Sequence, residues 1–176
     1  MTNIAIICET DKGESRCASN PETVKKFIQA GFEITVQQGA GVKASIPDGA
    51  FQKAGAKIAK SAELAVKNAD IVLAVRNYEI VKYMKPSAAL IALLNPYGNP
   101  KAVKICMEAG VRAFALELIP RITRAQSMDV LSSQSNLAGY RAVLEAAYYY
   151  HAVFPMMMTA AGTLAPARMF IMGAGV

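Results

Sequence analysis

Short apolar runs alternate with amphipathic segments along the first two thirds of the chain. In the amphipathic segments the apolar positions recur at helical spacing, as in the helix that Asn20 and Pro21 open and Gly31 closes. Another predicted helix begins at Pro100 and ends at Gly110. The continuous apolar runs predict buried strands at 4–8, 33–36, 71–75, 88–94 and 111–116. Strands separated by helices of about ten residues indicate βαβ units. We therefore predict an α/β fold with a doubly wound, mostly parallel sheet.

The pattern changes after Pro120. Residues 121–134 are polar, and from Leu137 to His151 apolar side chains recur every three or four positions, which predicts a long linking helix. Residues 167–172 are apolar again and predict the first strand of a truncated Rossmann domain. We expect three regions: an N-terminal α/β domain at 1–130, a linking helix and hinge at 131–165, and the start of the NAD-binding domain at 166–176.

Two runs of identical side chains fall within the second of these regions. The run 148–150 consists of tyrosines and predicts one buried ring with two rings at a surface or subunit contact. The run 156–158 consists of methionines, whose flexible thioethers favour packing in a core.

Composition narrows the possible partners and compartments. Hydrophobic residues make up 53% of the 176 residues and charged residues 18%, which favours a packed core over disorder. The net charge of +6 comes from scattered lysines, so we expect no nucleic-acid partner. The three cysteines show no metal-binding or disulfide spacing, which indicates a reducing, cytoplasmic location and no metal. The longest apolar stretch, 152–167, is interrupted by two prolines and a glycine, so no membrane span is expected.

Gly173 and Gly175 follow the last apolar run and match the opening of a G-x-G-x-x-G dinucleotide fingerprint. In that motif the glycines permit close approach of the backbone to a pyrophosphate, which rests on the next helix. The third glycine, the helix and the acidic ribose ligand are absent from this sequence. A flexible glycine tail is an equally compatible interpretation.

Residues 121–140 concentrate groups that form hydrogen bonds: two guanidinium groups, one carboxylate, three amides and several hydroxyls. Such groups are costly to bury unless they are paired, so their density beside an apolar helix predicts a polar cleft. Amides and hydroxyls suit a carboxamide and a ribose, and an arginine–carboxylate pair would fix orientation. A solvated loop with helix caps is the alternative interpretation.

The same segment, which reads PRITRAQSMDVLSSQSNLAGY, closely resembles the alpha subunit of proton-translocating nicotinamide nucleotide transhydrogenases. The wider relatives are alanine dehydrogenase and saccharopine dehydrogenase. The resemblance continues through 154–163 into the terminal glycines, and it extends more loosely over the N-terminal half, for example at Glu14-Ser15-Arg16. It covers the whole chain and is strongest from Glu117 onward.

This resemblance implies a cofactor and a site. Arg121, Gln126, Asp129 and Ser132 match positions that surround the nicotinamide, its carboxamide and the ribose of NAD. Gln126 would hold the nicotinamide end, and Asp129 with Arg121 would form the orienting pair, so these three are the expected catalytic residues. Gly173 and Gly175 would contribute to cofactor binding.

The resemblance also implies partners. In the family, hydride passes between NADH on this subunit and NADP on a partner component, coupled to proton movement through membrane helices elsewhere. We therefore expect a homodimer, membrane and NADP-binding partner components, and a cytoplasmic location peripheral to the inner membrane. The chain alone is expected to be inactive.

Two alternatives stay open. The chain could be a non-catalytic, dimerising scaffold that binds no nucleotide by itself, or it could be an alanine dehydrogenase-like relative. Alanine dehydrogenases use a lysine after the fourth strand and a histidine near the next strand. Here Arg76-Asn77-Tyr78 and Asn95-Pro96-Tyr97 occupy those regions, and the only histidine, His151, lies far along the chain. The substrate chemistry of an amino-acid dehydrogenase is therefore missing.

Overall fold

The structure, a computed structural model, describes residues 1–173 and residue 175. The chain divides between Pro120 and Arg121 into two compact units. The predicted boundaries at 130/131 and 165/166 stay predictions.

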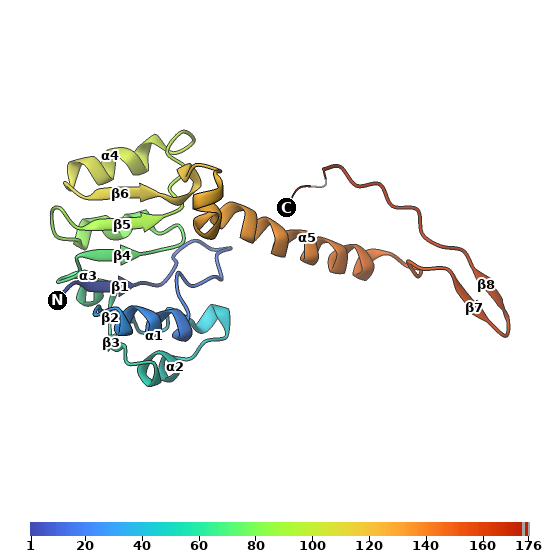
Figure 1. The fold of residues 1–176 in the computed structure, drawn as a ribbon, viewed down its shortest axis with the longest axis horizontal. Coiled ribbons are helices and arrows are strands. Elements are labelled where there is room, and N and C mark those ends of the chain that lie inside the picture. Colours follow the sequence, from blue (N-terminus) through green and yellow to red (C-terminus); the bar gives the residue numbers. More distant parts are fainter. Residues whose placement is uncertain (174, 176) are drawn as a thin grey trace. The chain divides into compact units, whose positions relative to one another are not determined.

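A six-stranded parallel sheet forms the centre of the first unit (Figure 1). The strand order is β3-β2-β1-β4-β5-β6, so the chain winds outward from β1 in one direction and then from β4 in the other. This arrangement confirms the predicted doubly wound α/β fold. The strands are β1 (Asn3–Ile6), β2 (Glu33–Gln37), β3 (Lys57–Ala59), β4 (Ile71–Leu73), β5 (Ala89–Ala92) and β6 (Arg112–Ala115).

Alternation along β1 and the residue after it, Ile7, explains how the sheet holds two cores. Ile4 and Ile6 belong to one buried cluster, whereas Ala5 and Ile7 belong to the other. Successive side chains of a strand point to opposite faces, so a continuous apolar run is what a strand covered on both faces requires.

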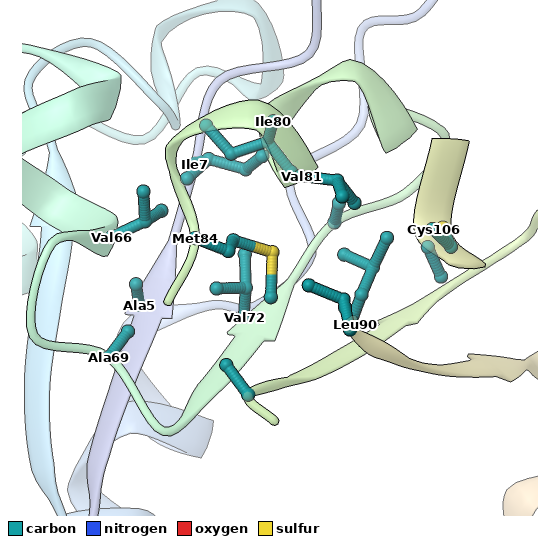
Figure 2. Packing of buried hydrophobic residues seen from close by; sticks show 14 of the residues in the cluster. Ala5, Ile7, Val66, Ala69, Val72, Ile80, Val81, Met84, Leu90 and Cys106 are labelled. Atoms are coloured by element: carbon teal, nitrogen blue, oxygen red, sulfur yellow. The ribbon is translucent and has the colours of Figure 1, made fainter. Parts of the chain in front are cut away.

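Different helices cover the two faces. The cluster around Ile4 and Ile6 is closed by α1 (Pro21–Gln29) and α2 (Asp48–Lys53). The cluster around Ala5 and Ile7 is closed by α3 (Ala62–Val66), the 3-10 segment η2 (Tyr78–Tyr83) and α4 (Pro100–Glu108). Figure 2 shows the second cluster, in which Ile80, Val81 and Met84 lie over Val72 and Leu90.

Several helix starts follow from local chemistry. The Asn20 side chain accepts the backbone N–H of Thr23 at 2.8 Å, and proline occupies the first helical position after it. The Asn99 side chain accepts from Ala102 in the same way at 3.2 Å. These caps satisfy N–H groups that have no partner within the helix, and both helices begin where the sequence predicts.

Strand β3 is absent from the sequence-based expectation. It has only three residues, it lies at the edge of the sheet beside β2, and none of its side chains is fully buried. A short edge strand with little burial has almost no apolar pattern in its sequence. Strand β3 is therefore recognised from its pairing with β2 and not from its composition.

The second unit contains the 3-10 segment η4 (Thr123–Met128), the long helix α5 (Val130–Tyr149), and an antiparallel hairpin of β7 (Met157–Thr159) and β8 (Gly162–Leu164). The predicted long helix is confirmed, although His151 lies just beyond its end. The remaining 3-10 segments, η1 (Val42–Ala44) and η3 (Leu116–Leu118), belong to the first unit.

Three expectations for this unit are wrong. Residues 167–172 form no strand, because a strand needs hydrogen bonds to a neighbouring strand and this segment pairs with none in the described chain. All three tyrosines at 148–150 are exposed, and so are the methionines at 156–158, two of which lie in β7. Apolar side chains become buried only where another element covers them, and no described element covers these.

Among residues 1–173 and 175, no helix is long and apolar enough to cross a membrane.

Phe51 provides a test of the core around Ile4 and Ile6. Its side chain is completely buried between α2 and the sheet, so Phe51→Ala should lower the free energy of unfolding by about 3–5 kcal/mol. Tyr97→Ala removes an exposed ring of similar size and should change it by less than about 0.5 kcal/mol. Urea denaturation followed by circular dichroism measures both, and equal losses in the two variants would contradict this placement of the core.

Candidate functional site

Four of the residues predicted from the polar segment lie in the second unit, near the start of α5. Arg121 precedes η4, Gln126 lies within η4, Asp129 is the N-cap of α5, and Ser132 lies in the first turn of that helix. In η4 the side chain of Ala125 is buried, whereas the side chains of Arg121 and Gln126 are exposed.

Asp129 and Ser132 are joined by two hydrogen bonds. The backbone N–H of Ser132 donates to Oδ1 of Asp129 at 2.9 Å, and the Ser132 hydroxyl donates to Oδ2 at 2.6 Å. The hydrogen bond from the Ser132 hydroxyl is the main cause of a lowered pKa of Asp129, and the charge of Arg121 lowers this pKa further. The structure thus brings Asp129 and Ser132 together and favours the charged form of the carboxylate. The charge of Arg121 acts on Asp129, although the two described side chains form no ion pair.

Gln126 is linked to Asp129 through the main chain. Its carbonyl oxygen accepts the backbone N–H of Asp129 at 3.2 Å, where η4 ends and α5 begins. Its side-chain amide faces solvent. The arrangement therefore offers an exposed amide, a fixed carboxylate and a guanidinium group within one turn-rich segment. These groups can orient a polar ligand, and none of them needs to transfer a proton to do so.

The two terminal glycines are less informative. Gly173 has a φ of +90°, a conformation that favours glycine, and a Cβ atom added to Gly173 or Gly175 would meet nothing within 4 Å. No other group of the described chain therefore lies close to either glycine. The role of the two glycines in cofactor binding stays a prediction. Ala174 and Val176, which belong to the same predicted motif, lie outside the described residues.

A second polar site lies in the first unit, where the strand order reverses between β1 and β4. Ligands of open α/β sheets bind beyond the carboxyl ends of the strands at such a switch point. A cavity of about 460 Å³ occupies this region, lined by Asp11, Gly13, Glu14, Ser15, Arg16 and Arg76. Sequence reasoning did not select this site.

Glu14 and Arg16 dominate the second site. The Arg16 side chain donates from Nε to Oε1 of Glu14 at 2.8 Å and from Nη2 to Oε2 at 2.6 Å. The Nε of Arg76 lies 3.9 Å from the same carboxylate. Hydrogen bonding from Arg16 is the main cause of a Glu14 pKa lowered to about 2. Both charges of the pair are therefore largely satisfied within the protein.

A signal for this site exists in the sequence, because Glu9, Asp11, Glu14 and Arg16 follow directly on the first apolar run. Their relation to Arg76, sixty positions away from Arg16, depends on the pairing of β1 with β4. Among the residues that the structure describes, no group of histidine, cysteine or acidic side chains is placed to hold a metal ion.

Known proteins match the chain along almost its entire length. The family model described as "Alanine dehydrogenase/PNT, N-terminal domain" matches residues 5–138, and the corresponding C-terminal domain matches residues 142–176. The chain belongs to the alanine dehydrogenase/PNT family.

Within this family the transhydrogenase branch is the more similar. A protein of Rhodospirillum rubrum that belongs to its NAD(P) transhydrogenase subunit alpha is 49% identical, over 98% of this chain and 47% of that protein. A crystal structure of transhydrogenase from Sinorhizobium meliloti superposes with a TM-score of 0.93 at 48% identity, covering 98% of this chain and 52% of that one. These findings confirm the resemblance to transhydrogenase alpha subunits.

The alanine dehydrogenase branch is more distant. "Alanine dehydrogenase 1" of Staphylococcus aureus is 29% identical, over 85% of this chain and 39% of that protein. The chain spans about half the length of the two transhydrogenase relatives described above.

The Glu14–Arg16 pair should give stability a defined pH dependence. The pKa of Glu14 is about 2 in the folded protein, below its ordinary value of 4.5. The pair therefore stabilises the fold fully above pH 4.5, and this contribution is lost as the pH falls toward 2. Because Arg16 is 37% exposed, solvent screening limits the contribution to about 1 kcal/mol.

Urea denaturation of the parent chain and Glu14→Gln between pH 2 and 7 measures this effect. The difference in unfolding free energy between them should be largest above pH 4.5 and should shrink below it. Parallel pH curves for the two proteins would refute the assignment.

Proposed function

We propose that this chain is part of the NAD(H)-binding component of a proton-translocating transhydrogenase, in which hydride passes between NADH and NADP. The observation that carries the proposal is the Asp129–Ser132–Arg121 cluster, because it lies inside the segment on which the transhydrogenase resemblance rests. The identity of 49% to a transhydrogenase alpha subunit supports it.

The groups present suit the nicotinamide end of NAD. The exposed amide of Gln126 can pair with a carboxamide or a ribose hydroxyl, since an amide both donates and accepts. Asp129 accepts two hydrogen bonds from Ser132, and a carboxylate has further lone pairs for a ribose hydroxyl. Arg121 supplies positive charge that helps to keep this carboxylate ionised. Gly173 and Gly175 would approach the pyrophosphate.

This set of residues matches a reaction that depends on position. Bound nicotinamide supplies the hydride chemistry, and the protein supplies orientation and electrostatics. Direct transfer between two nicotinamide rings needs no general acid or base, so the Asp129 carboxylate has an orienting role alone in this proposal. In this proposal NADP is bound by a partner component, protons move through membrane components, and the chain is cytoplasmic and peripheral to the inner membrane through those partners.

A chimera tests the proposal directly. Residues 1–176 would replace the matching segment of the Rhodospirillum rubrum subunit, and hydride transfer from NADH to an NADP analogue would be assayed with the other components of that transhydrogenase. We expect transfer in the chimera, and a loss of about 10-fold or more in Gln126→Ala and in Asp129→Asn. The second variant keeps a good helix N-cap but removes the charge.

Ser135→Ala, an exposed change in the same helix, serves as the matched control and should leave the rate unchanged. A folded chimera without transfer would refute the proposed function. Full transfer in the Gln126 and Asp129 variants would refute the site. The 176-residue chain alone should show no NADH binding in a calorimetric titration, and micromolar binding would contradict the expectation that it binds no nucleotide by itself.

A second candidate, a dimerising scaffold, is favoured by the surface of α5. No residue of this twenty-residue helix is buried. Leu137, Tyr140 and Leu144 recur on one side of it, and Tyr140 is 68% exposed. The β7–β8 hairpin is exposed as well, and an isolated two-stranded hairpin is only marginally stable in water. Exposed apolar surface of this kind is typical of protein interfaces.

Light scattering tests self-association. The chain has a mass of 18.8 kDa, and we expect a particle of twice that mass. Replacing Leu137 and Leu144 with aspartate should reduce the mass to that of a monomer, because charges would enter the apolar stripe. Ser135→Asp, on another side of α5, should leave the dimer intact. A monomer for the parent chain would contradict the scaffold and the expected homodimer.

A further inference from the structure

Three consecutive backbone amides at the end of β4 converge on one carboxylate. The N–H of Val75 donates to Oε1 of Glu9 at 2.6 Å, and the N–H groups of Arg76 and Asn77 donate to Oε2 at 2.9 and 3.0 Å. Glu9 is only 7% exposed. Successive N–H groups arranged in this way form a concave nest that binds anions. Here the anion is a side chain of the protein itself.

Further bonds fix the chain around Glu9. The side-chain amide of Asn77, which is also buried, donates to the carbonyl of Cys8 at 2.9 Å. The ammonium group of Lys43 donates to the carbonyl of Glu9 at 3.3 Å. Glu9 is therefore tied through both its backbone and its carboxylate, and the nest connects the carboxyl end of β1 to that of β4.

The middle residue of the nest carries the side chain that reaches the second polar site. Arg76 lines the cavity of about 460 Å³, with its Nε at 3.9 Å from the Glu14 carboxylate. Its side chain is 58% exposed, so packing alone does not fix its place. The position of its backbone is a further constraint beside the ion pair with Glu14, and the nest contributes three of the hydrogen bonds that set it.

We propose that Glu9 is a positioning residue: its carboxylate is the internal anion that shapes the 75–77 loop and thereby places Arg76 at the switch-point cavity. Three converging donors need an acceptor with several lone pairs, which an ionised carboxylate provides. Without it the three N–H groups would lose their shared acceptor, and the N–H of Asn77, a buried residue, would be left unsatisfied unless the loop opened to water. This role is independent of the nicotinamide site proposed above.

Hydrogen exchange of individual amides tests the proposal. Glu9→Gln keeps the size of the side chain but presents one acceptor oxygen and an NH₂ group that opposes the nest donors. In the 176-residue chain we expect the amides of residues 75–77 to exchange at least about 10-fold faster, and the Nε–H resonance of Arg76 to shift. The amides of β2, for example at Ile34, should keep their exchange rates. Glu79→Gln, an exposed change in η2, is the matched control and should alter neither.

Chemical rescue provides a second readout. Glu9→Ala removes a group the size of acetate, so acetate should restore protection of the three amides, whereas the neutral isostere acetamide should not. If Glu9→Ala does not fold, the Glu9→Gln comparison decides by itself. Unchanged protection in Glu9→Gln would overturn the proposal. A uniform rise in exchange across the whole sheet would also overturn it, because that result would make Glu9 an ordinary contributor to stability.

Discussion

Burial of β1 on both faces is the constraint on which the first unit depends. Its side chains enter two separate cores in alternation, so helices must cover the sheet on both sides. Placing β1 between β2 and β4 makes the chain reverse its direction of winding at the centre of the sheet. The carboxyl ends of β1 and β4 then lie next to each other, as the parallel pairing of the two strands requires. The position of the second polar site follows from this topology.

The polar side chains of the two units differ in their partners and in their exposure to solvent. At the switch point, Glu9 is occupied by three backbone amides and Glu14 by Arg16, so the charges are largely matched inside the protein. Near the start of α5, Asp129 is fixed by Ser132, while Arg121 and Gln126 are left exposed to solvent. The first arrangement stabilises a scaffold. The second keeps donors and acceptors available, as recognition of a polar ligand requires.

Exposure in the second unit extends beyond the polar segment. The apolar stripe of α5 and both strands of the hairpin have no covering element in the described chain. Such surfaces are costly in water, and association with another protein removes that cost. The transhydrogenase relatives are named as subunits, and this name supports the association with partners that we propose.

Sequence patterns alone predict the fold class, five of the six strands of the sheet, the starts of α1 and α4, the long helix, and the segment that brings Asp129 and Ser132 together. These features depend on local periodicity, on caps that reach three residues along the chain, or on neighbours within one helical turn. Other features depend on contacts between distant parts of the chain. Strand β3 exists through its pairing with β2, and the Glu9 nest through the pairing of β1 with β4. For the tyrosine and methionine runs, composition predicts buried side chains, but the side chains are exposed. Burial depends on whether another element covers them, which composition does not show. Contacts between residues far apart in sequence leave no periodic trace in either segment, so only the folded chain reveals them.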